Sequence, residues 1–303
     1  MKKWIIAAAA VLLLLAAGVY LYIPSTLVIA REVRLYCNPS AAFRSMNLDS
    51  NWQKWWPSPR EGGHVYRIAE KLNMQMNIGI EAGERKIMGR LIVLPRSNLD
   101  SAVLHWDCFI PAGSDPVTRL LRYREARLIK NETEEMLSHM RAFMEDPKNV
   151  YGMKIRRGMS MDSALIAMRW KTAIYPGTKE IYGVVGKLRS RAASEGAKET
   201  DPPMLHVKHG NDGRFEVMMA IPVDKLIKRS GDIFPERFVP WKIIIGETTG
   251  GAYTAEQAMV QLRKYMNDHQ YPTMAMPFQS LVTERDKEAD TSRWVTRVIV
   301  PVP

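Results

Sequence analysis

The sequence contains few of the residues from which catalytic and metal sites are usually built. Its 303 residues include only two cysteines and six histidines, which excludes a disulfide scaffold and a four-cysteine zinc site. His64, His105 and His139 are isolated and lack the spacing of metal ligands. No serine–histidine–aspartate pattern and no pair of carboxylates stands out. We therefore expect no catalytic residue, no metal and no cofactor.

The sequence also lacks a basic run of the kind that binds nucleic acid. It has 43 Lys and Arg against 32 Asp and Glu, a net charge of +11. This excess is shared evenly, with +5 in residues 1–150 and +6 in residues 151–303. Charge spread in this way usually keeps a protein soluble rather than forming a binding surface, and no helix-turn-helix or zinc-finger signature is present. We expect no nucleic-acid partner.

A long hydrophobic run occurs once, at the N-terminus. Trp4 to Ile23 are twenty residues without a charge, and Lys2 and Lys3 precede them. At 1.5 Å per residue they span about 30 Å, the thickness of the hydrocarbon layer. The run predicts a single transmembrane anchor over residues 1–24 in the cytoplasmic membrane. By the positive-inside rule its N-terminus lies in the cytoplasm and the domains that follow lie outside.

A cleaved signal peptide is the competing interpretation of this run. Its apolar core is usually about 7–15 residues long and ends at an Ala-x-Ala-like site. Here the core is longer, and Ala16-Ala17-Gly18 lies inside it. The length favours the uncleaved anchor, and a buried core helix is the third alternative.

Residues 25–148 are predicted to form a first α+β domain. A strand is expected over residues 27–37, followed by a short helix with Asn38 or Ser40 as its cap. A run of strands comes next, and then a long helix with Asp115 as its N-cap. One strand, short helices, antiparallel strands and a long final helix are a helix-grip order.

This half resembles the START-like (SRPBCC, polyketide cyclase) superfamily. The resemblance rests on the opening strand, the final helix and two segments, Asn38-Pro39-Ser40-Ala41-Ala42-Phe43 and Asn51-Trp52-Gln53-Lys54-Trp55-Trp56-Pro57. It implies binding of a hydrophobic small molecule between the sheet and the long helix, and only some members are enzymes.

Two sets of residues in this half have alternative interpretations. Trp52, Trp55 and Trp56 could line a ligand cavity, but buried aromatic side chains more often belong to the core. Cys37 and Cys108 fall on strands that the helix-grip topology makes neighbours. They are either a disulfide, which an oxidising compartment permits, or two buried thiols, because adjacent strands alone do not set the spacing that a disulfide needs.

Residues 149–303 contain a weak internal repeat. Residues 215–223 resemble residues 294–302, and each segment follows another predicted strand that itself follows a helix. The predicted helices are 179–195 and 254–269, and the predicted strands before the repeat are 204–209 and 278–283. The second domain is therefore predicted to contain two strand–helix–strand–strand units.

This pattern resembles the GyrI-like fold, the effector-binding domain of AraC-type and other regulators. The residues that carry it are Gly250-Gly251-Ala252-Tyr253, Pro277-Phe278-Gln279-Ser280-Leu281-Val282-Thr283 and the strand ends Ile221-Pro222-Val223 and Val300-Pro301-Val302. The resemblance implies a ligand cleft between the two units, with Tyr253, Phe278, Gln279, Tyr182 and Trp294 as its binding residues. The alternative for these aromatic residues is ordinary core packing.

Gln279 departs from the family's pattern. The family commonly has a glutamate at this place, facing the cleft, which serves cationic ligands or acts as an acid or base in hydrolytic members. A neutral amide cannot act as a general base or neutralise a cation. A different register would make Glu284 the nearest carboxylate, although its polar surroundings favour a turn.

The combined prediction is a membrane-anchored protein that binds a hydrophobic or amphiphilic small molecule without catalysis. One alternative is a hydrolase or cyclase that uses the second domain's cleft, and it rests on fold analogy alone. A second alternative is the sensor part of a regulatory system, although the sequence shows no DNA-binding segment.

Overall fold

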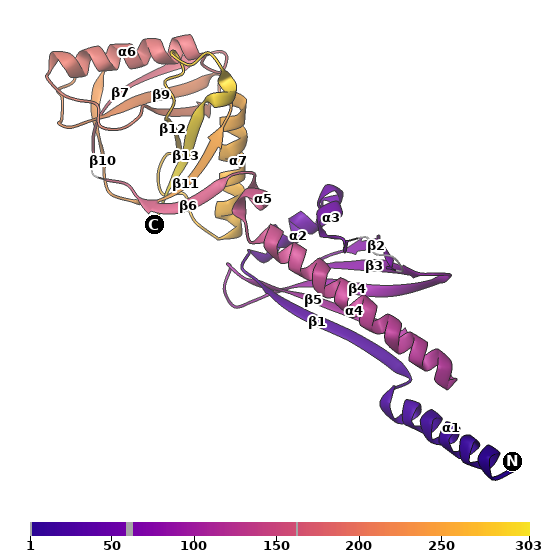
Figure 1. Ribbon diagram of the computed structural model, residues 1–303. Coiled ribbons are helices and arrows are strands. Elements are labelled where there is room, and N and C mark those ends of the chain that lie inside the picture. The colour runs from indigo at the N-terminus through magenta and orange to yellow at the C-terminus, as the bar shows by residue number, and fades with distance from the viewer. Residues whose placement is uncertain (1, 59–62, 162) are drawn as a thin grey trace. The chain divides into compact units, whose positions relative to one another are not determined.

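The computed structural model describes residues 2–58, 63–161 and 163–303. The chain divides into two compact units, Met1–Asp146 and Pro147–Pro303. Each unit is a mixture of helices and one antiparallel sheet (Figure 1), so the α+β class is confirmed.

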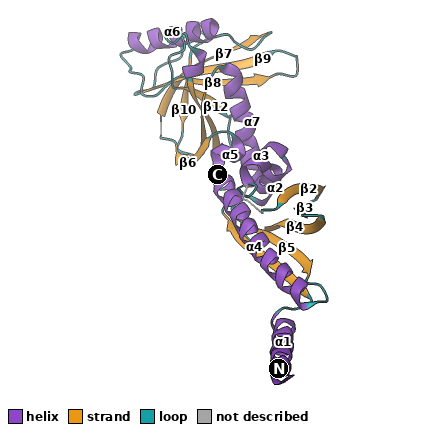
Figure 2. Ribbon diagram, turned by 45° about the vertical axis from the view of Figure 1, so that its right-hand side comes forward, coloured by secondary structure: helices purple, strands orange, loops and turns teal. Residues whose placement is uncertain are grey.

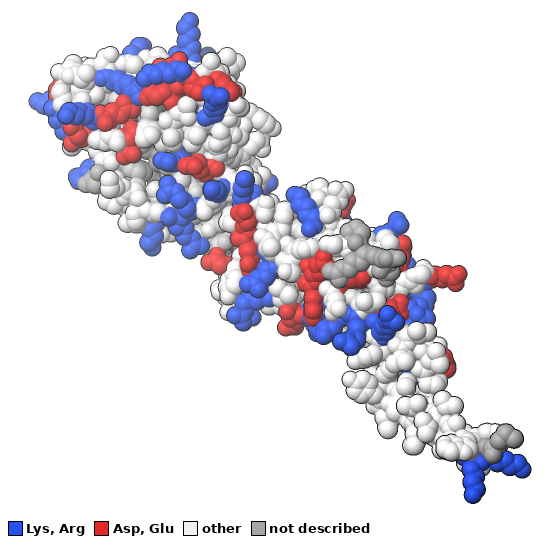
Figure 3. Space-filling view, viewed as in Figure 1, with Lys and Arg blue, Asp and Glu red and all other residues white. Residues whose placement is uncertain are grey.

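The first helix, α1 (Lys2–Tyr22), contains the predicted hydrophobic run. None of its side chains is buried, and it is long and apolar enough to cross a membrane. Figure 3 shows this segment without charged side chains except the basic ones at its start. Over the rest of this view, basic and acidic side chains are interspersed.

The first unit has the predicted order of strand, short helices, antiparallel strands and long helix. Its elements are β1 (Thr26–Leu35), α2 (Pro39–Asn47), α3 (Asp49–Trp55), β2 (Val65–Leu72), β3 (Gln75–Ala82), β4 (Arg85–Pro95), β5 (Ala102–Pro111) and α4 (Pro116–Met144). The sheet order is β1-β5-β4-β3-β2, and α4 packs against β1 and β5.

The predicted helix starts are confirmed. The Asn38 side chain accepts hydrogen bonds from the backbone N–H groups of Ser40 and Ala41, so Asn38 rather than Ser40 caps α2. The Asp115 side chain accepts from the backbone N–H of Thr118 at the start of α4. Both side chains satisfy donors that a helix N-terminus otherwise leaves unpaired.

The tryptophans of the first unit belong mainly to its core. Trp52, Trp55 and Trp106 are almost completely buried. Trp52 donates its indole N–H to the Met46 carbonyl at 2.7 Å, and its ring centroid is 5.2 Å from that of Trp55. Of the two interpretations of Trp52 and Trp55, the structure therefore supports core packing.

A disulfide between Cys37 and Cys108 is wrong, although β1 and β5 are neighbours as expected. Both thiols are buried. The strand register places Cys108 opposite Ile29, eight positions before Cys37. β1 ends at Leu35, six positions beyond Ile29, which is about 20 Å at 3.3 Å per residue. Cys37 lies only two residues past that end, so the two cysteines are beyond the reach of a disulfide.

The second unit contains the two predicted strand–helix–strand–strand repeats. The first is β7 (Ser163–Thr172), α6 (Thr178–Ser194), β8 (Met204–His209) and β9 (Phe215–Val223). The second is β11 (Lys242–Thr249), α7 (Ala252–Asp268), β12 (Phe278–Leu281) and β13 (Val295–Val302). The remaining elements are α5 (Pro147–Tyr151), β6 (Lys154–Met159), β10 (Phe234–Phe238) and a short 3-10 helix (Thr291–Arg293).

The two repeats form one sheet of order β10-β7-β9-β8-β12-β13-β11-β6. They meet where β8 pairs with β12, with Gln279 opposite Leu205 and Ser280 opposite Met204. Helix α6 packs on β7 and β9 (Figure 2), and α7 packs on β11 and β13 (Figure 1). Each repeat buries its apolar face under its own helix.

Candidate ligand-binding sites in the second unit

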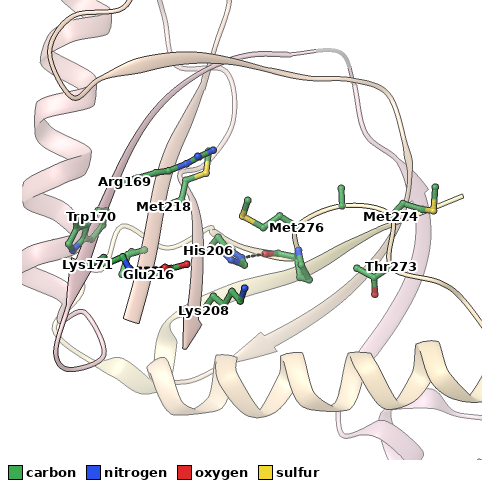
Figure 4. Close-up of a pocket in the computed structure, with 13 residues that line it drawn as sticks. Arg169, Trp170, Lys171, His206, Lys208, Glu216, Met218, Thr273, Met274 and Met276 are labelled. Carbon is green, nitrogen blue, oxygen red and sulfur yellow. Dashed lines mark hydrogen bonds and ion pairs between the residues drawn. The ribbon is translucent and has the colours of Figure 1, made fainter. Parts of the chain in front are cut away.

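A wide cleft of the second unit lies on the face of the sheet opposite α6. On β7, β8 and β9, side chains such as Leu205 and Met219 pack against α6, and their neighbours along each strand point the other way. These neighbours and the segment Thr273–Pro277 enclose a cleft of about 770 Å³ (Figure 4). Among its lining residues are Arg169, His206, Lys208, Met218, Met274 and Met276.

His206 provides a neutral polar group in this cleft. Its Nδ1 lies 2.6 Å from the Pro277 carbonyl oxygen, so Nδ1 carries the hydrogen and donates it. Burial lowers the pKa of His206, which keeps the ring neutral at pH 7. Its Nε2 is therefore left as a hydrogen-bond acceptor.

The cleft combines basic groups with a flexible apolar wall. Lys171 is paired with Asp212 at 3.1 Å and Glu216 at 3.0 Å, whereas Lys208 has no carboxylate within 4.0 Å in the described parts of the chain. Met218, Met274 and Met276 supply unbranched, polarisable side chains that adjust to irregular shapes. An amphiphilic ligand fits such a lining, with its apolar body on the methionines.

A smaller pocket of about 210 Å³ lies on the helix side of the sheet, where β8 and β12 meet. Gln279 lines it and is only 6% exposed. Its Nε2 donates to the Tyr175 hydroxyl at 3.2 Å, but its buried Oε1 has no hydrogen-bond partner among the residues that the structure describes. The remaining wall includes Val207, Phe215, Glu256, Met259 and Arg263.

Arg285 is a further buried polar residue of this unit, and it is not among the residues that line the pocket. It is 4% exposed and donates from Nη2 to Thr296 Oγ1 at 2.7 Å. Its guanidinium lies 5.0 Å from the centre of the Trp294 ring, and its backbone N–H donates to the Tyr182 hydroxyl at 2.9 Å. Its Nε is buried without a hydrogen-bond partner in the described parts of the chain. Burial lowers the pKa of Arg285, but a guanidinium stays charged at neutral pH.

The structure brings together only part of the predicted set. Gln279 lines the helix-side pocket. Tyr182 and Trp294 contact Arg285 instead and are not among the residues that line this pocket. Phe278 also borders the pocket, but its ring packs on the opposite face of the sheet, edge-on to Phe238 with 5.6 Å between ring centroids. Tyr253 is 73% exposed at the start of α7 and is not among the residues that line either cavity.

Glu284 belongs to neither cavity. Its Oε1 lies 2.5 Å from Nη2 of Arg189, and this ion pair lowers the pKa of Glu284. Gln279 therefore keeps its place in the pocket, and the alternative register with Glu284 is wrong.

Sequence reasoning missed Arg285, Tyr175, His206 and the methionine wall. Arg285 stands in a polar run between Thr283 and Ser292 that looks like an exposed turn. Its burial arises because Tyr182 of α6, more than a hundred positions away, and Trp294 of the same loop enclose it. The residues next to Arg285 in the sequence do not indicate that it is buried.

The first unit contains a separate buried network around Glu132 of α4. Glu132 accepts a hydrogen bond from the Tyr66 hydroxyl at 2.6 Å and lies 2.8 Å from Nδ1 of His64. The hydrogen bond to Glu132 raises the pKa of His64. Burial alone would raise the pKa of Glu132, but its bonds to His64 and Tyr66 outweigh this and lower it. The carboxylate is thus fully engaged within the protein.

Comparisons with known proteins give matches in solved structures only. No protein-family model and no curated protein matches the chain. The C-terminal domain of EcmrR is 15% identical, with a TM-score of 0.43 over 50% of this chain and 98% of that one. A structure described as a hydrolase from Listeria innocua is 11% identical, with a TM-score of 0.39 over 50% and 92%.

A START superfamily protein from Mycobacterium smegmatis is 12% identical, with a TM-score of 0.28 over 39% of this chain and 97% of that one. At these identities and TM-scores, the likenesses carry no information on ligand or activity.

Proposed function

We propose that this protein is held in a membrane by α1 and binds a small amphiphilic molecule in its second unit, without catalysing a reaction. In this proposal the first unit is a START-like domain and the second a GyrI-like domain. The observation that supports binding most directly is the cleft of about 770 Å³ opposite α6.

The lining of this cleft is typical of ligand sites. Small-molecule sites usually have volumes of about 300–1,000 Å³, mostly apolar walls and a few polar groups that orient the ligand. Here Met218, Met274 and Met276 form the apolar part, and the neutral His206 and the cationic Lys208 are the orienting groups. Within the described residues neither His206 nor Lys208 forms an ion pair with a carboxylate, and His206 bonds to the Pro277 carbonyl oxygen instead.

Filling the cleft with a larger side chain should weaken ligand binding strongly. We expect the full chain in lipid nanodiscs to bind the amphiphilic probe 1-anilinonaphthalene-8-sulfonate with a saturable fluorescence component that empty nanodiscs lack. Met218→Trp places a large ring in the cleft and should weaken this component by about tenfold or more, since a ligand then loses its apolar contacts.

The matched control is Leu226→Trp, the same ring on a leucine that is 63% exposed and is not among the cleft residues. This variant should bind the probe as the unaltered chain does. If both variants bind equally, or if no saturable component exists, the cleft is not the binding site.

The anchor makes a separate prediction. Because α1 has no buried side chain and no charge between Trp4 and Tyr22, we expect the full chain to remain with the membranes through an alkaline carbonate wash. Deletion of residues 2–22 should release it, since no residue of α1 is buried in the fold. The mass of the intact membrane-bound chain, measured by mass spectrometry, shows whether α1 has been cleaved off. A mass lower by that of α1 would show that α1 is a signal peptide.

A further inference from the structure

The N-terminal part of α4 carries an exposed apolar face. No side chain of residues 116–125 is buried, and burial along the helix begins at Ala126. Val117, Leu120 and Leu121 are each more than half exposed, and their i, i+3, i+4 spacing places them together on one side of the helix. Exposed apolar side chains that are contiguous, rather than scattered singly, mark a surface that meets a protein or a membrane.

This part of α4 is also held against the end of α1. The Tyr20 hydroxyl donates to the Ser114 carbonyl, and the Arg119 guanidinium lies 4.4 Å from the centre of the Tyr20 ring. Arg119 also donates from Nη1 to the Ile23 carbonyl at 2.9 Å. Tyrosines at the end of a membrane-spanning helix lie at the level of the lipid headgroups. When α1 spans a bilayer, the first turns of α4 therefore lie at that level too.

Basic side chains continue the exposed face along α4. Arg124 follows the apolar residues on the same side of the helix after one turn, and Arg127 lies one turn further. Both side chains are exposed. Glu125 is already paired with Arg85 and Arg122, so Arg124 and Arg127 have no carboxylate partner among the described residues. Apolar side chains next to unpaired cations are typical of a helix that lies in the interface of an anionic membrane.

We propose that α4 has a docking face for the bilayer that holds α1, and that this face binds anionic lipid headgroups. The docking face comprises Val117, Leu120, Leu121, Arg124 and Arg127. Its apolar side chains enter the boundary between headgroups and acyl chains, and its two arginines pair with lipid phosphates. This docking rests on the membrane anchorage of α1 proposed above, because α1 brings the face to the bilayer.

The test measures whether position 121 touches lipid. Cys37 and Cys108 are buried, so Leu121→Cys supplies an exposed thiol for a nitrobenzoxadiazole dye. The labelled full chain is placed in phosphatidylglycerol nanodiscs, with and without a phospholipid that carries a nitroxide quencher on its acyl chain near the headgroup. We expect the nitroxide to quench about half or more of the dye's fluorescence, because an apolar side chain of an interfacial helix enters that layer.

Leu94→Cys is the matched control for the label. Leu94 is exposed on β4, and Val103 pairs with both Leu94 and Arg34. Arg34 lies eight positions beyond Thr26, the first residue of β1, which is about 26 Å at 3.3 Å per residue. Leu94 is therefore at the end of the sheet far from α1, and a dye there should not be quenched.

Two double variants test the charge of the docking face. Arg124→Gln with Arg127→Gln should lower the quenching at position 121 by about twofold or more, because the attraction to anionic lipid is lost. The unaltered face should show the same reduction in phosphatidylcholine nanodiscs. Arg34→Gln with Arg96→Gln removes two exposed arginines from the far end of the sheet and should leave the quenching unchanged.

No quenching at position 121, or equal quenching at positions 94 and 121, would overturn the proposal. A blue-shifted emission at position 121 without quenching would also overturn it, because the face would then contact another protein chain. Equal quenching in the two lipids would exclude recognition of anionic headgroups. A chain that does not enter nanodiscs overturns the anchorage itself and the docking with it, whereas a chain that enters without quenching overturns the docking alone.

Discussion

Replacing Trp106 by alanine is expected to lower the free energy of unfolding of the first unit by about 3–5 kcal/mol. Trp106 on β5 is completely buried, and its ring covers Gly89 on the neighbouring strand β4. A Cβ added to Gly89 would lie 2.3 Å from the Cη2 and Cζ2 atoms of that ring. The ring therefore occupies the space that a side chain at position 89 would take.

Because of this contact, we expect the effect of a substitution at position 89 to depend on the residue at position 106. Gly89→Ala alone should cost about 1–3 kcal/mol by overpacking. In the Trp106→Ala background the same change should cost little, because the clashing ring is gone. The coupling of the two substitutions is measured by a double-mutant cycle, with hydrogen exchange of β4 and β5 peptides followed through a urea titration of the full chain.

Phe109→Ala is the matched control, because Phe109 lies on the same strand but is 55% exposed. It should cost about 1 kcal/mol or less. Additive effects of Gly89→Ala and Trp106→Ala would contradict the proposed contact.

Removal of the Glu132 carboxylate should be comparably damaging. Glu132→Ala is expected to cost the first unit about 3–5 kcal/mol, the usual result when one partner of a buried pair is removed. It leaves the Tyr66 hydroxyl and the nearly buried His64 ring without their shared acceptor. Glu134→Ala is the control on the same helix, since Glu134 forms an exposed pair with Arg31 that is worth about 1 kcal/mol or less.

The same network predicts how stability depends on pH. The pKa of His64 is raised above its ordinary 6.5 by the hydrogen bond to Glu132. The contribution of His64 to the free energy of unfolding is therefore complete below pH 6.5, and it is lost as pH rises through the raised pKa. The pKa of Glu132 is lowered from 4.5, because its hydrogen bonds outweigh burial. The contribution of Glu132 to the free energy of unfolding is complete above pH 4.5, and it is lost as pH falls through the lowered pKa.

The first unit should therefore be most stable between about pH 4.5 and 6.5, as far as this pair is concerned. Urea titrations of the full chain at several pH values, read on first-unit peptides, measure this. In Glu132→Ala the loss of stability from pH 6 to pH 8 should disappear. An unchanged pH profile in this variant would assign the pH dependence to other groups.

The sequence by itself determined the elements and their order. The hydrophobic run at Trp4–Ile23, the caps at Asn38 and Asp115 and the two repeated strand pairs each depend on nearby residues, and each lies where it was predicted. Local propensity and periodicity carry this information, because a cap or an amphipathic face needs only its own segment.

Only the tertiary structure decided which residues share a site. Register separates Cys37 from Cys108 by eight positions, and strand alternation turns Phe278 away from Gln279, its neighbour in the sequence. The burial of Arg285 depends on Tyr182, which is distant in the sequence, and on the ring of Trp294, which covers its guanidinium. Such contacts depend on how strands pair and how helices cover them, and a linear pattern does not contain that information.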